Sequence, residues 1–271
     1  MVEAEGSASR GGSPNPFPRE EERVLVVNCG SSSIKYQLLA MSGERRLAAG
    51  AVERIGEAGS SLRQCAAGAE EELREVAARD HREAIRHVVD ALRGAGALDP
   101  REALAAIGHR VVHGGERFHA PTLLDAAVCD ALRELAPLAP LHNPANLVGI
   151  EVCLAAFPEV QQVAVFDTAF HQTLPPRAFR YAVPEDWYRR FGVRRYGFHG
   201  VSHRYVAERA AGALGHPLAA LNLITLHLGN GASAAAIEGG RVVDTSMGLT
   251  PLEGLVMGTR SGDLDPAVPL Y

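Results

Sequence analysis

Short apolar runs that end in glycine-rich turns recur along the chain. Residues 24–28 are almost continuously apolar and β-branched, which predicts a buried strand, and residues 34–39 predict the strand that returns after a turn over residues 29–33. Residues 223–228 predict another strand, followed by a second glycine-rich turn over residues 229–233. Two units of strand, turn and strand, one near each end, indicate a duplicated α/β domain.

Apolar positions at helical spacing lie between these two units. They predict helices over residues 70–94 and 126–135, and a third helix that begins at Asn143, a capping residue, with Pro144 in its first turn. Shorter apolar runs predict strands over residues 107–112, 163–166, 234–237 and 241–244. This order of elements predicts an α/β fold whose two lobes face each other across a cleft.

The composition is that of a soluble globular protein. The 271 residues are 46% hydrophobic and 22% charged, and the net charge of -5 comes without any basic block that could follow a nucleic-acid backbone. No apolar run is long enough for a membrane-spanning helix, and residues 1–22 are expected to be a disordered extension, not a secretory signal. The four cysteines form no C-x-x-C pair, so we expect reduced thiols and a cytoplasmic protein. From the charge and the lack of a membrane-spanning run we expect neither nucleic-acid nor membrane partners.

The first glycine-rich turn has the residue types of an anion cradle. Backbone N–H groups of small residues approach an anion closely, and Ser31, Ser33 and Lys35 add hydroxyl donors and a positive charge. Asn28, at the end of the preceding strand, is placed to bind a metal-held water or a phosphate oxygen. The spacing is not that of a Walker A loop, and an ordinary serine-rich hairpin is the alternative interpretation.

The second turn, Gly229-Asn230-Gly231, has a stronger structural interpretation, because Asn-Gly is the commonest tight hairpin turn. Two such turns occur in one chain, each at the end of an apolar strand, and this favours an anion-binding role over a purely structural one. ATP carries several phosphates, and two hairpins that point into one cleft could hold them from both sides.

Three charged residues stand out from their surroundings. Arg110 lies inside an apolar strand and therefore needs an anionic partner, either a carboxylate or phosphate ligand or a glutamate of the protein. Arg260 lies in a glycine-flanked loop of the kind that often carries function. Asp167 follows four apolar residues, at the end of a strand where α/β sheets bind ligands, unless it caps the next segment.

His199 and His203 are four residues apart, a spacing that suggests zinc. We do not predict a zinc site, because no glutamate lies between them in the H-E-x-x-H manner and Gly200 interrupts a helix there. His113-Gly114-Gly115 is similar to a lipase oxyanion loop, but the chain has no G-x-S-x-G nucleophile elbow.

Together these segments resemble the acetate kinase family. The matching runs are residues 28–35, 108–116, 140–146, 165–171, 196–203, 227–233 and 245–266. The resemblance implies the sugar kinase/Hsp70/actin fold, a ribonuclease H-like α/β architecture of duplicated lobes, here over residues 23–170 and 171–271. It also implies ATP and Mg²⁺, with Mn²⁺ as a substitute, acetate and acetyl phosphate as ligands, and a homodimer for full-length members.

The resemblance assigns roles to individual residues. Asn28 matches a magnesium-linked asparagine, Arg110 the arginine that binds the substrate carboxylate, and Asp167 the catalytic aspartate. His199 and Arg260 match the residues that stabilise the transition state. The first phosphate hairpin is matched by Ser31, Ser33 and Lys35, the second by His227, Leu228, Gly229, Asn230 and Gly231, and the pocket around the substrate methyl by Val112, Leu141, Phe198 and Pro251, with His142 beside it.

The end of the chain departs from the family pattern. Family members continue well beyond residues 262–266, whereas this chain ends at Tyr271. We therefore expect an incomplete second lobe without the adenine- and ribose-binding loops and without a magnesium-linked glutamate. The activity and the dimerisation of this chain by itself are left open by the sequence.

The predicted reaction is reversible, in-line transfer of a phosphoryl group from ATP to acetate, which gives acetyl phosphate and ADP. Acetate is ionised at pH 7, since a comparable carboxyl group titrates near about 4.3, so we expect Asp167 to orient an arginine or the metal shell and not to act as a base. The alternatives are a propionate or butyrate kinase of the same family and a non-catalytic remnant that binds a carboxylate. A sugar kinase fits less well, because paired arginines and a methyl pocket suit a small acid.

Overall fold

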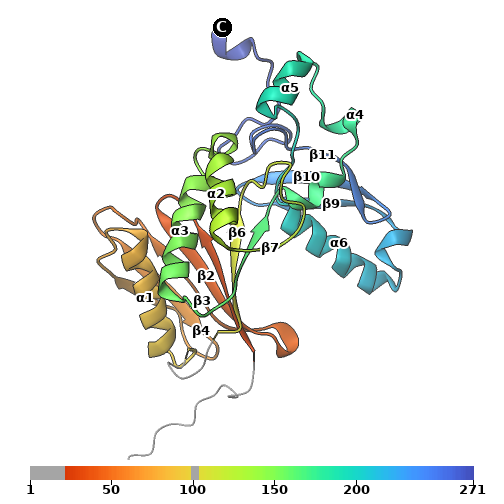
Figure 1. The fold of residues 1–271 in the computed structure, drawn as a ribbon. Coiled ribbons are helices and arrows are strands. Elements are labelled where there is room, and N and C mark those ends of the chain that lie inside the picture. The colour runs from red at the N-terminus through yellow and green to blue at the C-terminus, as the bar shows by residue number, and fades with distance from the viewer. Residues whose placement is uncertain (1–21, 99–103) are drawn as a thin grey trace, which may run out of the picture.

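The computed structural model describes residues 22–98 and 104–271, which form two β-sheets and their covering helices (Figure 1). The expected N-terminal extension, apart from Glu22, lies outside the described residues. The strands are β1 (Arg23–Cys29), β2 (Ser33–Ala40), β3 (Arg45–Glu53), β4 (Ser61–Ala66), β5 (Glu72–Glu75), β6 (Ala106–Val111), β7 (Thr122–Leu123), β8 (Gln162–Phe166), β9 (Asn222–Leu228), β10 (Ala232–Glu238) and β11 (Arg241–Thr245). The α-helices are α1 (His81–Gly94), α2 (Ala126–Glu134), α3 (Asn143–Ala156), α4 (Pro176–Phe179), α5 (Glu185–Phe191) and α6 (Gly200–Leu214), and short 3-10 helices cover Ser42–Glu44, Ala136–Leu138, Ala169–Thr173, Leu218–Ala220 and Val268–Leu270.

The first sheet has the strand order β5-β4-β3-β2-β1-β6-β8-β7. β1 pairs in parallel with β6, and β6 pairs in parallel with β8, whereas β1 to β5 form an antiparallel meander. Because β1, β6 and β8 run in the same direction, their carboxyl ends meet at one edge of the sheet. The Gly30 turn, Val112 and Asp167 follow these three ends.

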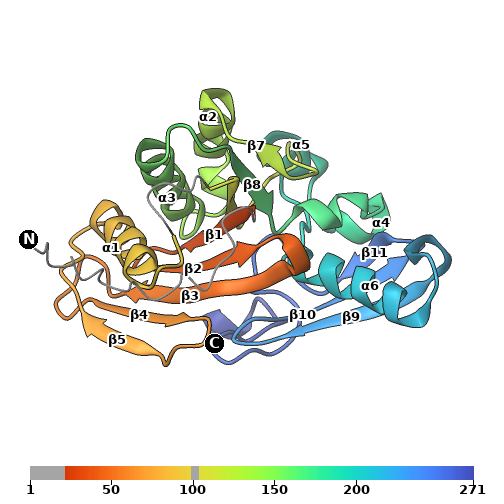
Figure 2. The ribbon, with the colours of Figure 1, turned by 90° about the horizontal axis from the view of Figure 1, so that it is seen from below.

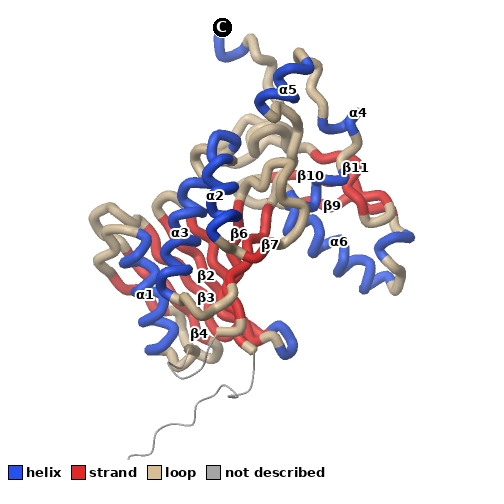
Figure 3. The backbone as a smooth tube through the Cα atoms, viewed as in Figure 1, coloured by secondary structure: helices blue, strands red, loops and turns tan. Residues whose placement is uncertain are grey.

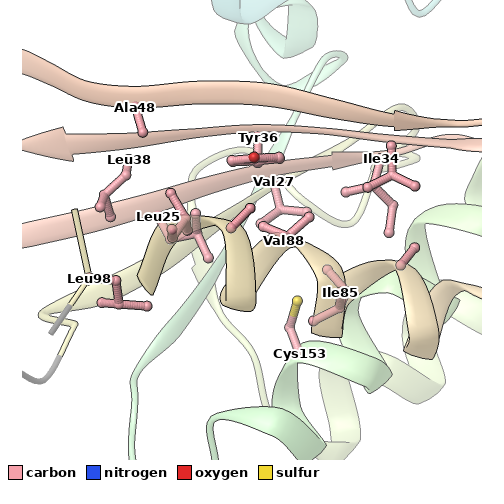
Figure 4. Close-up of a cluster of buried hydrophobic side chains, with 14 of the residues drawn as sticks. Leu25, Val27, Ile34, Tyr36, Leu38, Ala48, Ile85, Val88, Leu98 and Cys153 are labelled. Atoms are coloured by element: carbon pink, nitrogen blue, oxygen red, sulfur yellow. The ribbon is translucent and has the colours of Figure 1, made fainter. Parts of the chain in front are cut away.

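Helices α1, α2 and α3 cover one face of this sheet (Figure 2). The side chain of Asp80 caps α1 by accepting a hydrogen bond from the backbone N–H of Glu83 at 2.8 Å. The buried face of α1, including Ile85 and Val88, then packs against apolar residues of β1 and β2 (Figure 4). Each fully buried aliphatic side chain in this core contributes about 1.5–3 kcal/mol, so the sheet is a firm base for the groups at its edge.

The second sheet is smaller and repeats the start of the first. Its order, β11-β10-β9, is that of an antiparallel meander joined by tight turns, as in β3-β2-β1. Helix α6 packs against β9, and the residues after β11 are mostly loop up to the last short helix (Figure 3). The two related meanders agree with the predicted repetition of strand, turn and strand.

Two predictions made from the sequence are wrong. The helix expected over residues 70–94 begins only at His81, because Glu72–Glu75 pairs with β4 as an edge strand, and β3 and β4 were not predicted. Asn143 does not cap α3, since the residue before the first turn is His142 and makes no side-chain cap. The Asn143 side chain instead holds the backbone of His113, as described below.

Among the described residues, no helix has both the length and the apolar character needed to cross a membrane.

Candidate active site

A buried carboxylate and an arginine meet where β6 and β8 end. Asp167 follows β8, is 2% exposed, and its backbone N–H donates to the carbonyl of Val111 at 3.0 Å. Arg110, on β6, donates from Nε to Oδ1 of Asp167 at 3.0 Å and from Nη2 to Oδ2 at 2.6 Å. This two-pronged contact raises the pKa of Arg110 and fixes the plane of its guanidinium group. The anionic partner that the sequence required for Arg110 is thus an aspartate directly after the neighbouring strand β8, not a glutamate.

Buried amide side chains hold the backbone around this pair. Asn146, on α3, accepts from the N–H of Val112 at 3.0 Å and donates to the carbonyl of Cys29 at 2.6 Å, so it ties the end of β6 to the end of β1. Asn143 accepts from the N–H of His113 at 3.1 Å and donates to its carbonyl at 2.9 Å. Asn146 was missed in the sequence and Asn143 was predicted only as a helix cap, although two asparagines three apart on one face of an apolar helix are a signal that they serve a buried polar contact.

The second glycine-rich turn carries two more of the predicted groups. A Cβ atom on Gly231 would lie 2.8 Å from Nη2 of Arg260 and 3.1 Å from Nε2 of His199, so both side chains lie directly against this glycine. Arg260 also donates to the carbonyl of Pro251 at 2.8 Å and to that of Asn230 at 3.4 Å. The absence of a side chain at Gly231 therefore allows the arginine and the histidine to lie side by side.

The loop that carries Arg260 is anchored to the second half of the chain. Arg195 donates to Oε1 of Glu253 at 2.6 Å and to the carbonyl of Thr245 at 2.9 Å, and Tyr181 donates to the same carboxylate. At the far end of the loop, the N–H of Gly254 donates to Oδ1 of Asp263 at 2.8 Å. These contacts limit the positions that an otherwise irregular loop can adopt.

The charged groups of the first half of the chain (residues 23–170) and of the second half (residues 171–271) act on each other. Partial burial and then the positive charges of Arg110 and Arg260 lower the pKa of His142, whereas Asp167 acts in the opposite direction. Burial lowers the pKa of His199 to about 4, and His227 and Arg110 lower it further, whereas Asp167 acts in the opposite direction. Arg110, Asp167, His142, His199 and Arg260 thus form one electrostatic neighbourhood, which we call the arginine–histidine site.

An apolar cluster borders the arginine–histidine site. Val112, which follows Arg110 by two residues, is 8% exposed and packs in a cluster with Phe198, Ala232, Met247 and Met257. Two of the predicted methyl-pocket residues therefore come together from the two halves of the chain. A third is placed differently, since Leu141 is 79% exposed and lies outside this cluster, and Pro251 is half-buried beside Arg260.

The first glycine-rich turn is fixed by a hydrogen bond within it and by a contact with α1. The N–H of Gly30 donates to the carbonyl of Ser33 at 2.7 Å, and the carbonyl of Gly30 lies 2.8 Å from Nε2 of His81. Asn28 and Lys35 are cross-strand partners whose side chains border a hollow on the face of the sheet opposite the helices. Within residues 22–98 and 104–271, no hydrogen bond or ion pair joins this turn to the second one, so the predicted meeting of the two turns around one triphosphate stays a prediction.

His199 and His203, which we did not predict to bind zinc, make contacts with hydroxyl groups through their ring nitrogens. His199 lies just before α6 with a left-handed backbone, φ 59°, and its Nδ1 is 2.9 Å from Oγ of Ser233. Nε2 of His203 is 2.8 Å from the same Oγ, and Nδ1 of His203 is 2.8 Å from Oγ1 of Thr225. Gly200 does not interrupt a helix here, because α6 begins at this residue.

The protein groups fit part of a metal–nucleotide site. Within the described ranges no three His, Cys, Asp or Glu side chains are close enough to one another to hold a metal ion. Magnesium is commonly bound by one or two protein oxygens together with phosphates and water, and the amide of Asn28 can serve in that way. The arginine–histidine site supplies positive charge and donors without any metal-binding cluster, which suits a phosphorylated ligand.

Comparison with known proteins now adds to this geometry. The family model of the acetokinase family matches residues 23–271. The chain belongs to the acetokinase family. It is 55% identical over 251 residues to the acetate kinase of Thermotoga maritima and 58% identical over 245 residues to that of Deinococcus deserti. These alignments cover 92% and 90% of this chain but 62% and 60% of the two relatives, so the chain spans about three fifths of their length.

Solved structures of acetokinase family members have the same fold. The acetate kinase of Porphyromonas gingivalis superposes with a TM-score of 0.87 at 48% identity, over 91% of this chain and 62% of the other. A propionate kinase from Francisella tularensis superposes with a TM-score of 0.86 at 42% identity, over 92% of this chain and 63% of the other. The predicted family and its α/β fold are therefore confirmed.

Proposed function

We propose that this chain carries the acid-binding and phosphoryl-transferring groups of an acetate kinase, which moves a phosphoryl group between ATP and acetate. The observation that carries the proposal is the arginine–histidine site, where Arg110 and Asp167 from the first sheet lie near His199 and Arg260 from the second half. Its apolar neighbour, the cluster around Val112 and Phe198, offers apolar contacts to a short alkyl group. Relatives of more than half identity that carry the name acetate kinase support the same activity.

Arg110 is proposed to bind the carboxylate of the acid. Its guanidinium group is already oriented by two hydrogen bonds to Asp167, which leaves other N–H groups for a second carboxylate. Asp167 then acts through Arg110, because an acid that is ionised at pH 7 needs no general base. In-line attack by this carboxylate on the γ-phosphorus forms the new P–O bond as the bond to the ADP oxygen breaks.

His199 and Arg260 are proposed to neutralise the migrating phosphoryl group. Arg260 supplies a fixed positive charge, whereas the low pKa of His199 makes it a neutral hydrogen-bond donor near pH 7. Each such donor is worth about 2.7–4 kcal/mol of transition-state stabilisation. In this proposal Asn28 and Lys35 hold the magnesium-linked phosphates, and the metal neutralises phosphate charge when bound.

Acetate is the proposed acid, and propionate is the second candidate. The propionate kinase with a similar structure favours testing it, and one methylene changes binding by only about 1–3 kcal/mol. The cluster around Val112 also contains Met247 and Met257, whose flexible side chains can accommodate a longer acid. Ratios of kcat/KM for acetate, propionate and butyrate decide between them.

The test is formation of acyl phosphate by the purified 271-residue chain, trapped as a hydroxamate. Product with ATP, Mg²⁺ and acetate is expected, together with inversion at a chiral γ-phosphate. Asp167→Asn is expected to lower turnover without a new pH dependence near neutrality. No product, while acetate still raises the melting temperature, would contradict the proposed enzyme and support the carboxylate-binding remnant.

A cytoplasmic location and assembly into a homodimer are part of the same proposal. All four cysteines are unpaired thiols, which suits a reducing compartment. Size-exclusion chromatography with light scattering tests the dimer directly, and a monomer at all concentrations would contradict it.

A further inference from the structure

Four side chains of the second half form one continuous line of hydrogen bonds. Oγ1 of Thr225 lies 2.8 Å from Nδ1 of His203, and Nε2 of His203 lies 2.8 Å from Oγ of Ser233. The same Oγ lies 2.9 Å from Nδ1 of His199, whose Nε2 faces Gly231 and Arg260. Thr225, His203 and Ser233 are buried at 5%, 1% and 0% exposure, so water does not compete for these contacts.

The chemistry of the line couples the protons of its members. A serine hydroxyl has one proton and can donate to only one of its two histidine neighbours, and its proton is used when it accepts from the other. If Ser233 donates to Nδ1 of His199, it accepts from Nε2–H of His203, and Nδ1 of His203 then accepts from the hydroxyl of Thr225. In that arrangement both imidazole rings carry their proton on Nε2.

We propose that Ser233, His203 and Thr225 are positioning residues that fix His199 as the Nε2–H tautomer, directed at the transferred phosphoryl group. The contacts couple the tautomers of the two rings, and the choice of the Nε2–H tautomer rests on the proposed function. The reversed line would put the proton on Nδ1 and direct the lone pair of Nε2 toward an anion, which is repulsive. Binding of the phosphoryl group therefore selects the direction of the line that puts the proton on Nε2.

The surroundings of His199 agree with a neutral ring of fixed orientation. Burial lowers the pKa of both His199 and His203 to about 4, so neither ring is charged near pH 7. The ring of His199 stacks on that of His227 with centroids 4.0 Å apart. Its left-handed backbone is a costly conformation for a residue with a side chain, and such conformations concentrate where a functional group must be aimed.

Histidine tautomers can be measured without any enzymatic activity. In the chain labelled with ¹⁵N-histidine, two-bond ¹H–¹⁵N correlation spectra at pH 7 distinguish a protonated from a bare ring nitrogen. We expect His199 and His203 each to be protonated on Nε2 and bare on Nδ1, and an H199N variant assigns the His199 signals. A proton on Nδ1 of His199, or a charged ring, would overturn the proposal.

Two variants and one matched control test which groups fix the tautomer. Ser233→Ala removes the donor to Nδ1, so signals of a second His199 tautomer or exchange broadening are expected, and Thr225→Val should act in the same direction but more weakly. Ser202→Ala removes the hydroxyl 2.9 Å from Nδ1 of the stacked His227, and it should leave the His199 signals in place. A single Nε2–H tautomer of His199 in the Ser233→Ala variant would show that Ser233 does not fix it.

Kinetics separate this inference from the proposed function. In the direction of acetyl phosphate synthesis, Ser233→Ala is expected to lower kcat about tenfold, the rate equivalent of one hydrogen bond, with the KM for acetate unchanged. A rise in KM with kcat unchanged would contradict a role at the transferred group. If the unsubstituted chain forms no acetyl phosphate but shows the Nε2–H tautomer, the proposed function fails and the positioning line stands.

Discussion

The meanders β1–β2–β3 and β9–β10–β11 have the same layout in different surroundings. Ile34, on β2, is 0% exposed beneath α1, whereas Ile224, on β9, is 77% exposed and lies on the open face of a three-stranded sheet. The first meander thus belongs to a large core, whereas the second combines a smaller apolar core, which includes Ile237 and Val242, with polar contacts among histidines and hydroxyl groups. The comparison teaches that one local pattern can serve as scaffold in one half and as a chemical site in the other.

The largest effect is expected from acid. Burial lowers the pKa of His109 and His113 to about 4 in the first half, and that of His171, His199 and His203 to about 3 to 4 in the second. Since each folded pKa lies below the ordinary 6.5, this stabilisation is complete above about pH 6.5 and is lost as the pH falls toward about 4. Each such histidine lowers the free energy of unfolding by up to roughly 3 kcal/mol at acid pH, because the unfolded chain binds the proton more tightly.

Three of these five histidines lie in the second half, so acid should unfold that half first. Trp187, on α5, is the single tryptophan and reports on it. Its fluorescence is expected to change at a higher pH than the far-UV signal, because α1, α2 and α3 of the first half contain more helical residues than α4, α5 and α6 of the second. One coincident transition would remove the distinction between the halves, and the exposed His119, replaced by Gln, is the control that leaves both transitions in place.

The next effect separates the two arginines of the site. Arg110→Ala leaves the buried Asp167 without its partner, which is expected to lower the free energy of unfolding by about 3 kcal/mol, less than a fully buried pair because the arginine is partly exposed. Arg260→Ala removes bonds to backbone carbonyls at a loop and should cost about 1 kcal/mol. Both variants should lose at least about a hundredfold in kcat/KM.

Urea unfolding and the hydroxamate assay measure these two quantities side by side. Arg117→Ala is the matched control, because Arg117 pairs with an exposed carboxylate of Glu134 and should change neither by much. Equal losses of stability in Arg110→Ala and Arg260→Ala would show that the second half is as firmly supported as the first.

Much of this arrangement could be read from the sequence, and the failures have physical reasons. The strands β1 and β8 were predicted because burial leaves a nearly continuous hydrophobic run. β9 was predicted from its apolar run as well, although only Thr225 in it is buried. Glu72–Glu75 was missed because all four residues are exposed, so pairing with β4 and not burial makes it a strand. Arg110 and Asp167 were singled out separately, but their contact joins residues 57 positions apart in the sequence. The line from Thr225 to His199 needs four positions in three elements, which no local pattern reveals.

A smaller effect is expected when one glycine in each of the two turns is replaced by alanine, which compares the turns. Gly231→Ala would place a Cβ atom 2.8 Å from Arg260 and 3.1 Å from His199, so it should displace both and lower kcat about tenfold with little loss of stability. The corresponding contact of Gly30→Ala is only with Oγ of Ser33 at 3.3 Å, which can rotate away, so a fall of about twofold is expected. Steady-state kinetics on both variants test this, and a larger loss for Gly30→Ala would reverse the proposed roles of the turns.

The smallest expected effect comes from making the same substitution once in each of the two meanders. Ile34→Val deletes a methylene from the core under α1 and should lower the free energy of unfolding by about 1 kcal/mol, whereas Ile224→Val on the open face should stay within about 0.5 kcal/mol. Because the substitution is the same and both residues lie on strands, differences in β-propensity cancel and only burial distinguishes them. Equal losses in denaturant unfolding would mean that the outer face of β9 is covered in solution, by a second copy of the chain or by other residues. In that case the contrast between scaffold and site would apply to the histidine line alone.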